Sequence, residues 1–112
     1  MIYSHCEIDN NTMIKHVVMW RLKENAEGND KSGNAAAVTD MLLKLKPVIS
    51  EIDSIEIGSN INESDAAFDL VLITTHLDKQ ALASYIAHPA HQEAASFIGK
   101  VVAERNVVDF EY

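Results

Sequence analysis

Apolar and polar residues alternate along several short segments of this chain and recur at helical spacing in others. Residues 14–22 alternate with period two, which is typical of a strand, and both faces of that strand carry apolar side chains. Apolar residues from Val38 to Leu45 follow the spacing of one buried helical stripe. The whole pattern predicts strands over residues 14–22, 52–61, 68–77 and 105–112, a helix over 34–45, a helix that begins at 79, and a helix from 88 to about 104.

The segments between these elements carry recognisable start and stop signals. Residues 23–33 are rich in charge, Asn and Gly, so we expect a loop there. Asp78 is a candidate N-cap, and Pro89 after His88 is suited to the first turn of a new helix. Pro47 predicts a kinked or tightened end for the helix before it. We expect residues 1–12 to be a flexible leader and residues 13–112 to form the domain.

The order β-α-β-β-α-β predicts an α+β fold of the ferredoxin-like kind, with an antiparallel four-stranded sheet. The segments from 79 and from 88 together form the second helical crossover, and two crossovers on one side can cover only one face of such a sheet. Apolar residues of the other face, among them Val17, Met19 and Ile73, then need a second layer. Face-to-face pairing of two sheets supplies it, so we expect a homodimer formed through the sheet face.

Composition and charge indicate which partners the protein is not expected to bind and where in the cell we expect it. The chain has 112 residues, enough for one domain, and its formal net charge of −8 argues against nucleic acid and anionic membranes as partners. No apolar run approaches the roughly 20 residues that span a bilayer. The N-terminus shows no signal-peptide pattern, so we expect a cytoplasmic protein. The one cysteine, Cys6, cannot form an internal disulfide and is interpreted as incidental.

Four residues could carry chemistry. Tyr85, His88 and His91 are spaced three apart, which would place them on one face of an unbroken helix, although Pro89 bends that geometry. Histidine can accept a proton near neutral pH, and a tyrosine hydroxyl can bind an oxygen that gains negative charge. His16 is a polar residue on an apolar strand face, and Tyr85 or His91 could be its partner.

The same residues also have structural interpretations that involve no chemistry. His88-Pro89 could be a helix junction with a histidine cap, and a strand histidine is usually a satisfied core residue. His88 and His91 with His16 or Asp69 could instead hold a metal ion, although a histidine pair split by proline is a weak signal for metal. The remaining side chains are interpreted as solvated surface (His5, His76) or as core and pocket wall (Trp20, Phe68, Phe97, Phe110).

Three segments, MIKHVVMWRLKE, YIAHPAH and RNVVDFEY, together with the element order, resemble the stress-responsive A/B barrel (Dabb) family. The resemblance covers residues 13–112 and implies a dimeric α/β barrel. In cyclase-like members of that family the second histidine of HPxH is the base, a tyrosine six residues earlier holds the substrate, and a strand histidine lines the pocket. These roles fall on His91, Tyr85 and His16. Asp69 stands where the cyclase has a further histidine, so the same substrate is not expected.

Three functional hypotheses follow. The first is an enzyme that needs no cofactor and acts on a small, partly apolar carbonyl or polyketide-like compound, with His91 as base and Tyr85 as anchor. His16 would assist, and the pocket would also include Asp69, Trp20, His88 and Phe97. The second is a non-enzymatic stress protein that acts through its stable dimer. The third is a carrier or sensor of a small apolar ligand.

Overall fold

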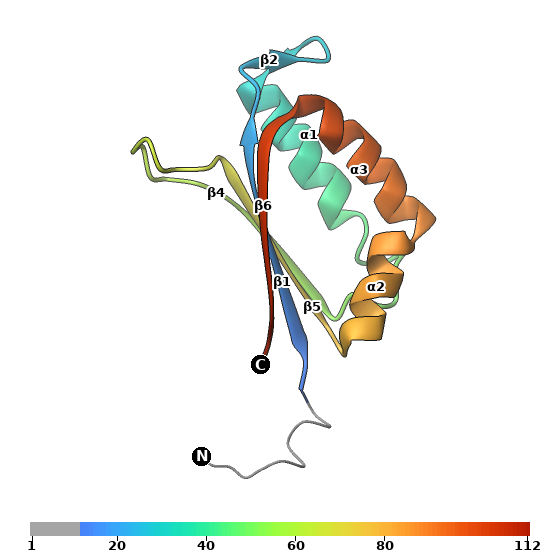
Figure 1. The fold of residues 1–112 in the computed structure, drawn as a ribbon. Helices are drawn as coiled ribbons and strands as arrows, with labels where there is room; N and C mark the ends of the chain where they lie inside the picture. Colours follow the sequence, from blue (N-terminus) through green and yellow to red (C-terminus); the bar gives the residue numbers. More distant parts are fainter. Residues whose placement is uncertain (1–11) are drawn as a thin grey trace.

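The computed structural model describes residues 12–112, in which three helices pack on one face of a four-stranded antiparallel sheet (Figure 1). The expected leader, with Cys6 and His5, falls almost wholly outside the described residues. The large sheet contains β1 (Ile14–Leu22), β4 (Ser54–Ser59), β5 (Leu70–His76) and β6 (Val102–Glu111). The helices are α1 (Lys31–Leu43), α2 (Lys79–Ala87) and α3 (Pro89–Val101).

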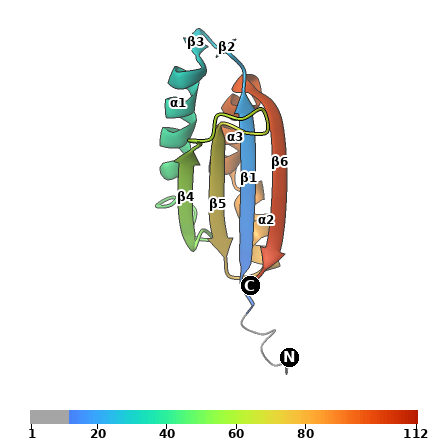
Figure 2. The same ribbon diagram turned by 90° about the vertical axis from the view of Figure 1, so that its left-hand side faces the viewer.

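The strands lie in the order β4-β5-β1-β6, and every neighbouring pair is antiparallel. This order is the one that two split crossovers produce, so the predicted ferredoxin-like α+β fold is confirmed. The bounds of β1 match the predicted strand, because period-two alternation is unambiguous there. Figure 2 looks onto the face of the sheet that carries no helix.

The two faces of the sheet differ in burial because side chains alternate along each strand. On the helix face, alternate residues of β1 and β5 are buried, from Ile14 to Leu22 and from Leu70 to His76. On the bare face, Met19, Val108 and Phe110 remain exposed. The helix face therefore holds the core, and the bare face keeps apolar side chains without cover from the described part of the chain.

Each helix begins at a side chain that accepts a hydrogen bond from a free backbone N–H. Asp30 accepts from the Gly33 amide at 2.9 Å, and Asp78 accepts from the Ala81 amide at 2.8 Å. The expected cap at Asp78 is therefore confirmed. The cap at Asp30 explains why α1 starts three residues before the predicted helix, while α1 ends at Leu43 and turns follow through Pro47.

The strands β4 and β5 lie within the predicted ranges 52–61 and 68–77 but are shorter at both ends. The structure differs from the sequence prediction at two further places. The expected loop over residues 23–33 contains a small hairpin of β2 (Asn25–Ala26) and β3 (Asn29–Asp30) and the start of α1. Glu27 and Gly28 both have positive φ, as a tight two-residue hairpin turn requires. The last strand starts at Val102 instead of residue 105, because α3 ends at Val101 and the chain enters the sheet at once. Within residues 12–112, no helix is long and apolar enough to cross a membrane.

Candidate functional site

A cavity of about 260 Å³ lies between the helix face of the sheet and α1 and α3. Strands β1, β5 and β6 form its floor, and α2 contributes Tyr85 from its last turn. Its wall is mainly apolar, with a few polar side chains. The lining residues are His16, Val18, Trp20, Leu42, Leu72, Tyr85, His91, Ala94, Ala95, Ile98, Gly99, Val102 and Arg105.

Two polar atoms in this lining are buried without a hydrogen-bond partner among the described residues: the Tyr85 hydroxyl and His91 Nδ1. The two rings are in edge contact, with centroids 4.7 Å apart. Burial raises the pKa of Tyr85 to about 12, and burial lowers the pKa of His91 below its usual 6.5. Buried polar groups normally find partners, so two such atoms beside one cavity make it the candidate binding site. The Ile86 backbone opposes the lowering of the His91 pKa, although no His91 hydrogen bond of ordinary geometry is formed within residues 12–112.

His16 belongs to the same cluster and is almost fully buried. Its Nδ1 lies 2.5 Å from a carboxylate oxygen of Asp109, opposite it on β6. A carboxylate accepts the Nδ1 proton, so Nε2 is the ring nitrogen left to exchange a proton. The ring of His16 lies 6.1 Å, centroid to centroid, from that of Tyr85. The expected convergence of Tyr85, His91 and His16 is therefore present in the structure.

His76 is a fourth member, and the sequence reading placed it wrongly on the solvated surface. It is fully buried at the end of β5, with its ring centroid 4.9 Å from that of Tyr85. The Glu51 carbonyl accepts its Nδ1–H at 2.8 Å, and the Thr74 hydroxyl bonds its Nε2 at 2.8 Å. Both ring nitrogens are satisfied, so His76 supports Tyr85 by packing. The missed signal was its even position in β5, in phase with the buried Leu70 and Leu72.

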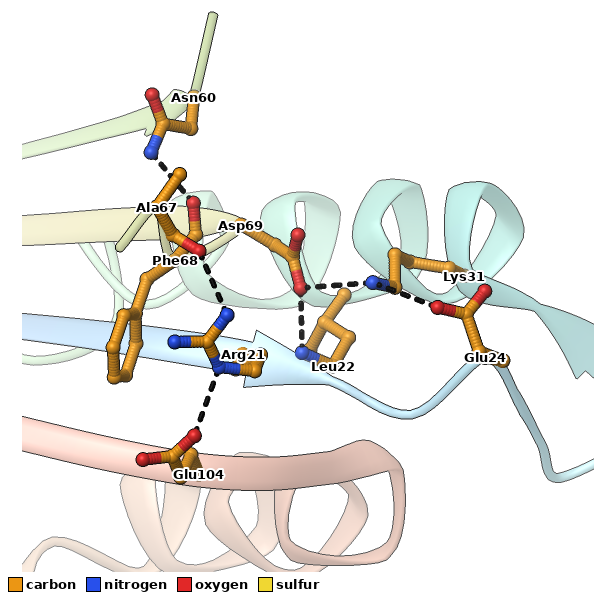
Figure 3. A network of polar contacts seen from close by, with 9 residues as sticks. All are labelled: Arg21, Leu22, Glu24, Lys31, Asn60, Ala67, Phe68, Asp69 and Glu104. Atoms are coloured by element: carbon orange, nitrogen blue, oxygen red, sulfur yellow. Dashed lines mark hydrogen bonds and ion pairs between the residues drawn. The ribbon is translucent and has the colours of Figure 1, made fainter. Parts of the chain in front are cut away.

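Asp69 lies outside the cavity lining. Figure 3 shows its carboxylate beside Leu22 and Lys31. Asp69 directly precedes β5 and is out of phase with the buried Leu70. One oxygen of its carboxylate accepts the Leu22 backbone N–H at 2.7 Å and pairs with Lys31 Nζ at 3.4 Å. Those contacts tie the end of β1 to the start of α1, which is a structural role.

The other expected pocket residues divide between wall and scaffold. Trp20 is buried and lines the cavity. His88 is not in the lining: its Nδ1 accepts the Ala90 N–H at 3.0 Å and caps α3, as the structural reading proposed. Phe97 packs against the core from α3 without lining the cavity. Among residues 12–112, no three His, Cys, Asp or Glu side chains are grouped closely enough to hold a metal ion.

Two lining or supporting residues come from β6 and were not singled out from sequence: Arg105 and Asp109. The register of β6 against β1 pairs Arg105 with Trp20 and Asp109 with His16, which brings both to the helix face. Sequence could have found them only if that register had been known, since alternation in residues 105–112 does not separate the two faces by hydrophobicity.

Fold and cavity together define a ferredoxin-like α+β protein with a small chamber between its sheet and its helices. Residues 14–112 match the family model described as the stress responsive A/B barrel domain. The chain belongs to that family, and the resemblance noted in the sequence is confirmed.

The chain is similar to one uncharacterized protein in sequence and to two solved structures in fold. The chain is 28% identical over 100 residues to an uncharacterized protein of Streptomyces coelicolor, covering 89% of this chain and all of that protein. A dimeric ferredoxin-like protein of unknown function from Thermobifida fusca superposes with a TM-score of 0.79 at 20% identity, over 91% of this chain and 92% of the other. A hydroxynitrile lyase from Passiflora edulis superposes with a TM-score of 0.76 at 12% identity, over 89% and 93%.

Proposed function

We propose that this chain is an enzyme that needs no cofactor and moves a proton on a small, partly apolar carbonyl compound bound in the cavity. His91 is the base, and the Tyr85 hydroxyl binds the carbonyl oxygen. The observation that carries the proposal is the pair of buried polar atoms, the Tyr85 hydroxyl and His91 Nδ1, that have no partner beside an apolar cavity.

The protonation states support these roles. Because burial lowers the pKa of His91, its imidazole is neutral near pH 7 and can accept a proton. Because the pKa of Tyr85 is raised to about 12, its hydroxyl keeps its proton and can donate a hydrogen bond. Removal of a proton next to a carbonyl leaves negative charge on the carbonyl oxygen, and a donor fixed at that oxygen stabilises the charge.

His16 supplies a second proton-transfer group in this scheme. The carboxylate of Asp109 fixes its ring orientation and tautomer. Once Nε2 has taken up a proton from solvent, His16 can return it to the product while His91 releases its own proton to solvent, so the protons balance over one turnover. The hydroxynitrile lyase of Passiflora edulis has this fold, so the fold accommodates an enzyme in that protein.

Proton exchange tests the proposal without knowledge of the natural substrate. Neutral ketones, such as acetophenone and 4-oxo-4-phenylbutanamide, are incubated with the protein in D₂O, and NMR follows the loss of their α-protons. We expect the wild-type protein to accelerate exchange by roughly 10²-fold or more over buffer, the low end for a positioned base. His91→Gln should abolish the acceleration.

His88→Asn is the matched control, since it also removes a histidine of the HPxH segment but keeps a good N-cap for α3. It should retain the full exchange rate. Equal rates for the wild type and His91→Gln would refute the role of His91. A ketone that raises the melting temperature without any exchange would favour a carrier over an enzyme.

We also propose that the chain acts as a homodimer through the bare face of the sheet (Figure 2). Val17, Ile73 and Val108 sit side by side at the centre of that face, because β1 pairs Val17 with both of the others. Val108 is 59% exposed and Phe110 44% exposed, so the face offers apolar area that a second copy can bury. The protein of Thermobifida fusca, described as dimeric, supports this proposal.

A further inference from the structure

Arg105 places a positive charge in the wall of the cavity of a chain whose net charge is −8. It lies on β6 opposite Trp20, whose buried side chain marks the helix face of the sheet. Arg105 is itself exposed, so it stands on the solvent side of the cavity while Tyr85 is fully buried. The charge therefore lies where the outer end of a bound molecule would lie.

No carboxylate among residues 12–112 lies within 4.0 Å of the Arg105 guanidinium. Arg21, the only other arginine, has Glu104 at 2.8 Å and stacks over Phe68 (Figure 3). The acids on the same face of β6 have other partners: Asp109 is held by His16, and Glu111 lies 3.9 Å from Lys79. Within the described residues, the guanidinium of Arg105 thus has no acidic partner, although 17 carboxylate side chains are present in the sequence.

The charge also acts on the proposed reactive groups. It opposes the burial that raises the pKa of Tyr85, and it adds to the burial that lowers the pKa of His91. A negative group bound at Arg105 would cancel both effects, so Arg105 is electrically coupled to the site.

The geometry of the guanidinium group indicates which kind of anion Arg105 binds. A single guanidinium offers two parallel N–H donors that match the two oxygens of a carboxylate. A phosphate dianion would bring more negative charge than one arginine offsets, in a chain that is already strongly acidic. The cavity volume of about 260 Å³ suits a molecule of the size of one substituted aromatic ring.

We propose that the natural substrate is a small keto acid, whose carboxylate binds Arg105, whose hydrocarbon body lies against the apolar wall, and whose carbonyl oxygen meets Tyr85. This inference rests on the proposed function and adds the substrate class to it. Arg105 is then the residue that determines specificity, while the proton is moved by His91.

Calorimetric titration with a matched pair of probes tests the assignment: 4-oxo-4-phenylbutanoate and its neutral amide, 4-oxo-4-phenylbutanamide. We expect the acid to bind the wild-type protein about tenfold more tightly than the amide, the lower end for a charge-assisted hydrogen bond. Arg105→Gln should remove that difference and leave the affinity for the amide unchanged. Arg105→Lys should keep part of that difference in affinity, because lysine keeps the positive charge but lacks the two parallel N–H donors of the guanidinium.

Lys46→Gln is the control, since it removes one positive charge from an exposed site outside the cavity lining and should leave both affinities unchanged. Equal binding of acid and amide by the wild type, with both weakened by Tyr85→Phe, would overturn the keto-acid assignment and leave the proposed site standing. Binding of neither probe at millimolar concentration would overturn both. Loss of acid affinity in Arg105→Gln, with no effect of Tyr85→Phe on either probe, would place the anion outside the cavity. Tighter binding of phenyl phosphate than of the keto acid would refute the carboxylate class.

Discussion

The Tyr85→Phe variant tests whether the Tyr85 hydroxyl serves function or stability. Removal of an unpartnered functional hydroxyl should stabilise the fold, and removal of a structurally bonded one should destabilise it. The hydroxyl is buried and unpartnered within the described residues, and leaving such a group without a bond costs roughly 1–3 kcal/mol. Its removal keeps the ring, so the contacts with His76 and His91 persist. We expect the variant to be more stable by about 1 kcal/mol or more, and to lose most of its ketone exchange. For a domain of this size the melting temperature should rise by roughly 4–8 °C per kcal/mol.

Urea unfolding followed by circular dichroism measures this change, at one fixed protein concentration because a dimer unfolds in a concentration-dependent way. Tyr112→Phe is the matched control. Its side chain is 51% exposed, so loss of the hydroxyl should change the unfolding free energy by no more than about 0.5 kcal/mol. A Tyr85→Phe protein less stable than the wild type by about 1 kcal/mol would contradict the reasoning, because the hydroxyl would then have a structural partner.

Two further predictions concern the assembly and the effect of pH. Val108→Glu should convert the proposed dimer to a monomer in sedimentation at micromolar concentration. Val48→Glu, at a residue 58% exposed and away from the sheet, should not, and a dimeric Val108→Glu protein would exclude the sheet face as the interface. His76 and His91 have pKa values lowered by burial from 6.5, so the unfolded chain binds protons first as pH falls. The melting temperature should therefore decline below about pH 6.5, before most carboxylates titrate. His76→Gln should make that decline less steep. An unchanged melting temperature of the wild type between pH 7.5 and 5.5 would contradict the role of the buried histidines.

Local patterns in this chain were sufficient for the main strands and helices, but not for the start of α1 or for the hairpin of β2 and β3. The bounds of β1 and the cap at Asp78 follow from alternation and from capping chemistry, which depend only on neighbouring residues. The start of α1 was missed because the cap at Asp30 lies inside a segment that is otherwise typical of a loop. The hairpin of β2 and β3 was missed because two-residue strands carry no periodicity to detect.

The site was only partly predictable, because it depends on contacts between distant strands. Tyr85, His91 and His16 were identified, although the spacing of the first two is interrupted by Pro89. The pairing of His16 with Asp109 joins residues 93 positions apart, and only the register of β1 against β6 reveals it. Asp69 was expected in the pocket because it stands where the cyclase of the resembled family has a further histidine, yet its phase relative to Leu70 directs it elsewhere.

The central claim is that the cavity beside Tyr85 and His91 is a binding site. Its most direct test is an NMR titration that follows the ring resonances of individual histidines as 4-oxo-4-phenylbutanoate is added. If the chamber is a binding site, the rings of His91 and His16 should shift together and saturate at one dissociation constant. The ring of His88, which caps α3 outside the chamber, should stay nearly constant. Shifts confined to His88, or no histidine shift at saturating probe, would show that the ligand does not bind in the cavity.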